Sequence, residues 1–131
     1  MTTPQPVILF ADRDLSWSRS ARLALRDRGA RVFRTSTVDA ALHFAAAAPP
    51  DVIVLDDELE GARGRDVVEL FQEAHPDAEI ILVESRTPET PRGIAHGLFY
   101  SGMKPIARGT LLDLIEDAVP GRLHHEPVSG R

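Results

Sequence analysis

Short apolar runs alternate along the chain with longer stretches in which apolar residues recur every three or four positions. The runs at 7–11, 52–55 and 80–83 are continuous, as expected for parallel strands that are covered on both faces. The runs at 31–35 and 98–101 are less apolar and suit the outer strands of a sheet. The pattern therefore predicts five strands.

The stretches between the runs have the apolar spacing of helices that bury one face. They lie at 17–25, 38–45, 67–74 and 111–118. Pro88, Pro91, Gly93 and Gly97 restrict any helix before the last strand to a short one, at 90–96. Strands that alternate with helices in this way predict an α/β domain of three layers, with a parallel sheet between two layers of helices.

Capping residues support this division of the chain. Asp14 or Ser16 is placed to cap the first helix, and Ser36 or Thr37 to cap the second. The domain is expected to span 5–119, and 120–131 is expected to be a mobile tail.

The composition narrows the possible functions without naming one. A chain of 131 residues is long enough for one domain with its own core. It contains no cysteine, which excludes disulfides, thiolate metal sites and cysteine nucleophiles. No apolar run reaches the length of a membrane span and the first residues lack a secretion signal, so we expect a cytoplasmic protein. The net charge of −5 gives no general attraction to nucleic acids, although it is compatible with a local basic patch.

Charged residues gather where the predicted strands end. In an open parallel sheet, ligands and chemistry collect at the carboxyl ends of the strands. The charged residues at or just after these ends are Asp12, Arg13, Asp14, Asp56, Asp57, Glu58, Glu84 and Lys104. The sequence therefore predicts a charged crevice at one edge of the sheet.

Three segments that contain these charged residues resemble parts of the receiver domain of two-component response regulators. "PDVIVLDDELEGARG" is similar to the segment around the family's phosphoacceptor aspartate, which falls on Asp56. "MKPI" resembles its lysine-proline signature, with the lysine at Lys104 and a cis bond before Pro105. "ILFADRD" resembles its acidic pocket, with Asp12 as the first acid. The resemblance covers about residues 5–119 and implies a doubly wound, flavodoxin-like (βα)5 fold with strand order 2-1-3-4-5.

The resemblance also implies a mechanism. A sensor histidine kinase or phosphotransfer protein would donate a phosphoryl group to Asp56 in a phosphorelay, and the protein itself would not be an enzyme. Magnesium would be held by Asp12, Asp56 and Glu58, because it prefers hard oxygen ligands. Lys104 would pair with the phosphate.

The output of such a domain is a protein contact. The switch positions fall on Glu84 and Ser101, with Tyr100 beside the latter. The resemblance implies that a downstream protein partner binds a face made by Tyr100, Met103, Ile106 and Arg108. We expect no direct contact with nucleic acid or membrane, and the sequence leaves a homodimer open.

The sequence departs from the family pattern at Glu60, where a proline is common, in a shortened stretch between Glu84 and Lys104, and at three positions of the site itself. Arg13 stands at the second acid of the pocket, Glu84 at a Thr or Ser position, and Ser101 at an aromatic position. One alternative is that the Arg13 guanidinium forms a bidentate ion pair with Asp56 or Glu84 and replaces the metal. The other is that Arg13 lies in solvent and magnesium binds through Asp12, Asp14 and Asp56, although Asp14 also suits a helix cap.

These departures leave two possible functions open. The first is a receiver that is phosphorylated on Asp56. The second is a phosphorylation-independent pseudo-receiver that acts as a constitutive protein-interaction module. An enzyme on the same fold agrees poorly with the sequence. No glycine-rich phosphate loop follows the first strand, and the sequence contains no recognisable nucleophile–base pair.

Overall fold

The computed structural model describes residues 4–59, 61, 64–84 and 97–124 of the chain. Five strands form a single sheet in the order β2-β1-β3-β4-β5, and every neighbouring pair is parallel. The strands are β1 (Val7–Ala11), β2 (Arg31–Thr35), β3 (Val52–Asp56), β4 (Glu79–Glu84) and β5 (Leu98–Met103). The predicted strand order is confirmed.

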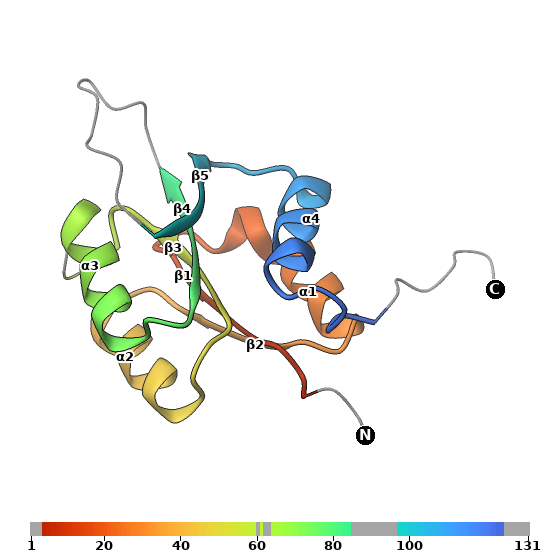
Figure 1. Ribbon diagram of the computed structural model, residues 1–131. Helices are drawn as coiled ribbons and strands as arrows, with labels where there is room; N and C mark the ends of the chain where they lie inside the picture. The colour runs from red at the N-terminus through yellow and green to blue at the C-terminus, as the bar shows by residue number, and fades with distance from the viewer. Residues whose placement is uncertain (1–3, 60, 62–63, 85–96, 125–131) are drawn as a thin grey trace.

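Helices cover both faces of the sheet (Figure 1). They are α1 (Arg19–Asp27), α2 (Val38–Ala47), α3 (Gly64–Ala74) and α4 (Arg108–Ala118), and a short 3-10 helix, η1 (Ser16–Ser18), precedes α1. Helices α1 and α4 lie on one face, and α2 and α3 lie on the other. The expected helix at 90–96 lies outside the described residues.

The alternation of side chains along each strand divides the core into two layers. On β1, Ile8 and Phe10 pack towards α1 and α4, whereas Leu9 and Ala11 pack towards α2 and α3. All five residues of β3 are buried, because this strand lies between β1 and β4 with helices on both sides. This is why its sequence is apolar up to its last residue.

The helix starts agree with the sequence in one case and differ in the other. Thr37 caps α2, since its Oγ1 accepts a hydrogen bond from the Ala40 N–H at 3.1 Å. Helix α1 begins later than expected, after η1, and its N-cap residue Ser18 makes no capping bond with its side chain. Asp14 instead accepts the Ser16 N–H at 3.0 Å, so it caps the turn that precedes the helix.

The end of the described chain corrects the prediction of a mobile tail from residue 120. Leu123 is buried in the core layer of α1 and α4. Arg122 Nη1 lies 2.8 Å from Asp51 Oδ1 at the start of β3, and Arg28 Nε donates to the His124 carbonyl at 2.8 Å. The folded domain therefore extends at least to His124. None of the helices in the described ranges is long and apolar enough to cross a membrane.

Candidate functional site

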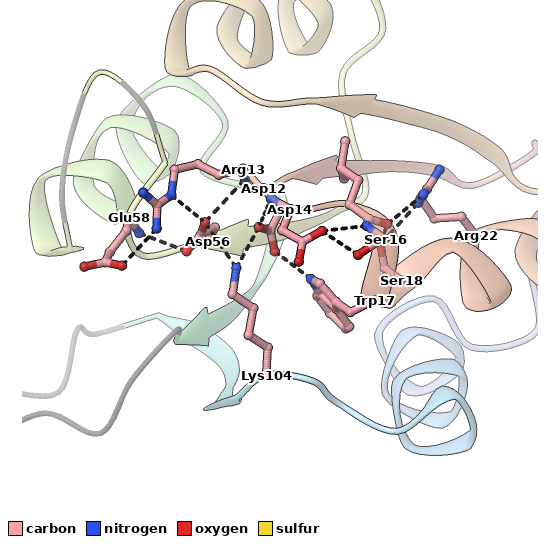
Figure 2. A network of polar contacts seen from close by, with 11 residues as sticks. Asp12, Arg13, Asp14, Ser16, Trp17, Ser18, Arg22, Asp56, Glu58 and Lys104 are labelled. Atoms are coloured by element: carbon pink, nitrogen blue, oxygen red, sulfur yellow. Dashed lines mark hydrogen bonds and ion pairs between the residues drawn. The ribbon is translucent and has the colours of Figure 1, made fainter.

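The charged crevice is built at the carboxyl ends of three strands. Asp56 is the last residue of β3, and Asp12 follows β1, where its N–H donates to the Thr35 carbonyl of β2. Lys104 follows β5, and its N–H donates to the Glu84 carbonyl at the end of β4. Because these ends share one edge of the sheet, their side chains converge (Figure 2).

Lys104 joins the two aspartates. Its Nζ lies 2.7 Å from Asp12 Oδ1 and 3.3 Å from Asp56 Oδ2. The side chains of Asp12 and Asp56 are 2% and 0% exposed, and that of Lys104 is 14% exposed. The peptide bond between Lys104 and Pro105 is cis, as expected. The structure thus brings together the three residues that the sequence placed in one crevice.

The charged groups of the crevice shift one another's pKa values. Burial would lower the pKa of Lys104, but its bond to Asp12 and the charge of Asp56 raise it on balance. Burial raises the pKa of Asp12. Burial would also raise the pKa of Asp56, but the Glu58 N–H and the Lys104 charge hold it below its usual value. Lys104 and Asp56 therefore form an ionised pair at neutral pH.

Arg13 lies across the mouth of the crevice. Its backbone N–H donates to Asp56 Oδ2 at 3.4 Å, and its Nε lies 3.7 Å from the same oxygen. Its Nη2 lies 3.1 Å from Glu58 Oε2. Asp56 therefore has a guanidinium on one side and an ammonium on the other (Figure 2).

Of the two partners considered for Arg13, Asp56 is found and Glu84 is not found in the described part of the chain; the second carboxylate is that of Glu58. The reason is geometric, because β3 separates β1 from β4 in the sheet. Glu58 is brought close by its own N–H, which donates to Asp56 Oδ1 at 3.0 Å. That bond folds the chain after β3 back over Asp56.

Trp17 is a site residue that the sequence reading missed. Its indole Nε1 donates to Asp12 Oδ2 at 2.8 Å, whereas the sequence placed this position only at the start of the helical stretch at 17–25. A partly buried indole N–H usually finds an acceptor, and an acid five positions earlier was available. Asp14 turns away from the crevice to Ser16, which supports its role as a cap.

The three side chains that the resemblance implies as magnesium ligands, Asp12, Asp56 and Glu58, are each engaged by other groups in the crevice. Asp12 Oδ1 accepts from Lys104 and from the Asp14 N–H, and Oδ2 accepts from Trp17. Both oxygens of Asp56 are also engaged by cations or N–H groups. Magnesium prefers carboxylate and water oxygens in near-octahedral geometry, so a bound ion would compete with these contacts. Among the described residues, no group of three or more acidic or histidine side chains is arranged to hold a metal ion.

The predicted switch positions lie at the edge of the sheet. Glu84 is half-buried and ends β4, while Ser101 and Tyr100 are exposed on β5. Met103 is 45% exposed and Tyr100 is 37% exposed, and Phe99, which the sequence reading did not single out, is 36% exposed.

One member of the predicted partner face belongs to the core instead. Ile106 is 8% exposed and packs with Leu111 and Ile115 of α4. The loop after Pro105 turns its side chain inwards, so the exposed part of this face consists of Tyr100, Met103 and Arg108.

Known proteins resemble this chain in both sequence and fold. The family model described as the response regulator receiver domain matches residues 8–116. The photosynthetic apparatus regulatory protein RegA of Rhodovulum sulfidophilum is 37% identical over 78 residues, which are 60% of this chain and 43% of RegA. The chain therefore spans less than half the length of this relative.

The solved structures that match are similar in fold at low sequence identity. A CheY-like receiver domain protein from Methanospirillum hungatei JF-1 superposes with a TM-score of 0.76 at 19% identity, over 91% of this chain and 97% of the other. A response regulator from Thermotoga maritima gives a TM-score of 0.73 at 16% identity, over 88% and 98% of the two chains. The arrangement of strands and helices is thus that of these domains.

Proposed function

The chain belongs to the response regulator receiver domain family, and on that basis we propose how it takes part in two-component signalling. Receiver domains are signalling modules that interact with histidine kinases or phosphotransfer proteins. In this chain Asp56 holds the phosphoacceptor position and the signal leaves through protein contacts. Arg13 takes over the charge compensation that a metal would supply, so phosphoryl transfer to Asp56 is slow.

The position of Arg13 between Asp56 and Glu58 carries this proposal. Two unit charges about 4 Å apart interact by about 4 kcal/mol at an effective dielectric constant of 20. The guanidinium therefore offsets much of the charge that would otherwise attract a divalent cation. The side chain of Asp56 is also fully buried, so the carboxylate must be uncovered before it can attack a phosphodonor.

A second function, signalling without phosphorylation, is favoured by the switch positions. Glu84 offers a carboxylate where the family's mechanism uses a hydroxyl, and a carboxylate repels a phosphoryl group. Ser101 is exposed on β5 and lacks the ring that would report the change. On this reading the crevice holds one state of the domain, and partners bind that state constitutively.

Phosphorylation can be measured directly by intact-mass analysis with acetyl phosphate and magnesium. We expect the wild type to gain one phosphoryl mass at a rate at least about tenfold below that of Arg13→Asp, because the variant removes a covering cation. Asp56→Ala should gain none. Rapid, magnesium-dependent labelling of the wild type contradicts the role given to Arg13. Absence of labelling in both the wild type and Arg13→Asp favours the phosphorylation-independent function.

We place the output surface on β5, at Tyr100 and Met103. Both side chains are more than one third exposed, so they are available to a partner and contribute little to the core. The double variant Tyr100→Ala/Met103→Ala should lose binding of the downstream partner, measured by affinity capture and mass spectrometry, with an unchanged unfolding midpoint. Leu70→Ala, at a similarly exposed residue of α3 (40%), is the control and should retain the partner. Equal capture by both variants places the output on another surface.

A further inference from the structure

The positive charge of this acidic protein is concentrated in one segment. Residues 19–34 contain six arginines and a single acid, Asp27, in a chain whose net charge is −5. This segment forms α1 and β2. The local excess of positive charge therefore lies on one helix and the edge strand beside it.

Four of these arginines form one surface, which we call the arginine face: Arg19, Arg22, Arg26 and Arg34. The first three are spaced i, i+3 and i+7 along α1, so they lie on the same side of the helix. Arg34 joins them from β2, because it shares the strand face of Val32, which packs towards α1. The charges of Arg34, Arg26 and Arg19 act on Arg22, whose pKa is lowered by burial first and by these neighbours second.

The arginine face is not compensated from within the described residues. None of its four guanidiniums lies within ion-pair distance of a carboxylate there. Arg22 is 8% exposed, and among the described residues it donates to two neutral oxygens, Ser18 Oγ at 3.2 Å and the Leu15 carbonyl at 2.8 Å (Figure 2). A nearly buried cation is thus held in place beside three exposed ones.

This arrangement opposes the stability of the helix that carries it. Like charges three or four positions apart destabilise a helix. Arg19 also stands at the first residue of α1, where the helix dipole disfavours a cation, and the first turn contains no acid. A feature that is unfavourable for folding and is not compensated by any described residue indicates a ligand of opposite charge.

The size and surroundings of the arginine face favour a protein over a nucleic acid. Helix α1 has nine residues, so the stripe is about 13 Å long. A nucleic acid extends beyond that length and meets a domain whose remaining surface is acidic. Leu23 is 47% exposed and lies between Arg19 and Arg26 on the helix surface, where it offers an apolar contact.

We propose that the arginine face binds an acidic protein segment, in which several Asp or Glu side chains surround an apolar one. Guanidiniums bind carboxylates through two parallel hydrogen bonds, which gives such contacts a defined geometry. The surface is separate from the crevice and from β5, so this binding does not depend on phosphorylation of Asp56.

The test uses a fluorescein-labelled peptide of alternating Glu-Glu-Leu units, with binding followed by fluorescence anisotropy at about 50 mM salt. Arg19→Glu/Arg26→Glu should weaken binding at least about tenfold, since two attractive charges become repulsive. The matched control is Arg31→Glu. Its guanidinium lies on the opposite face of β2, 5.4 Å from the centre of the Phe33 ring, so affinity should change less than about twofold.

Two results overturn the proposal. One is equal loss of affinity in the control and the double variant, which indicates a non-specific charge effect. The other is stronger binding of a 20-base-pair DNA duplex than of the peptide at equal charge concentration. Circular dichroism verifies that each variant is folded, and Arg34→Glu, which leaves α1 intact, provides a second test on β2.

Discussion

Replacing Lys104 with methionine should lower the free energy of unfolding by about 3 kcal/mol, because removal of one partner leaves two buried carboxylates without their shared cation. Lys104 Nζ contacts Asp12 and Asp56, whose side chains are 2% and 0% exposed. Methionine keeps most of the apolar stem, so the measured loss reports the charge and not a cavity. Urea unfolding followed by circular dichroism gives the free energy, since Trp17 fluorescence is itself sensitive to the crevice.

A second variant separates this effect from a general loss of packing. Lys104→Met/Asp56→Asn removes one of the stranded charges and should recover at least half of the lost stability. Arg122→Met, at the opposite end of the strands, serves as the control, because its partner Asp51 is 31% exposed, and it should lose only about 1 kcal/mol. A loss below about 1 kcal/mol in Lys104→Met itself shows that Arg13 alone compensates both aspartates.

The sequence predicted the sheet because the spacing of apolar residues follows from which side chains are buried. The continuous run at 52–55 belongs to β3, which has helices on both faces. All five residues of this strand, including Asp56, are buried. The convergence of Asp12, Asp56 and Lys104 was also predictable. Parallel strands place all their carboxyl ends at one edge, so the position of a residue along its strand determines where it lies.

The pairing of side chains within the crevice could not be predicted in the same way. Arg13 contacts Glu58 and not Glu84 because the chain after β3 folds back over Asp56. Trp17 reaches Asp12 through a 3-10 turn that apolar spacing does not reveal. Such contacts depend on loop paths and rotamers, which hydrophobic patterning leaves undetermined.

The ends of elements were misread for a related reason. Ile106 and Leu123 were assigned to a partner surface and to a mobile tail, yet both are buried in the layer of α1 and α4. Each follows a proline, a glycine or a polar residue and lies outside the regular apolar spacing of the helix beside it, so it has no periodic context. Its burial follows from the turn that precedes it.

The arrangement of the crevice makes magnesium affinity the most direct measure of what Arg13 does. Its guanidinium lies 3.7 Å from Asp56 Oδ2 and 3.1 Å from Glu58 Oε2, so a divalent cation near either carboxylate meets a positive charge. Arg13→Asp reverses that charge and supplies a further oxygen ligand beside Asp56. Both changes favour a cation that prefers carboxylate oxygens.

We expect Arg13→Asp to bind magnesium at least about tenfold more tightly than the wild type, a change of about 1.4 kcal/mol. Trp17 fluorescence reports binding, because its indole donates to Asp12 in the same crevice, and calorimetry verifies the affinity. Arg31→Asp makes the same charge change at the first residue of β2, at the other end of the sheet from the crevice, and should leave the affinity within about twofold. Tight magnesium binding by the wild type, with no gain in Arg13→Asp, means that Arg13 moves aside and that the crevice is an ordinary metal site. The expected result instead assigns the acids at the end of β3 to a receiver crevice whose cation is part of the chain.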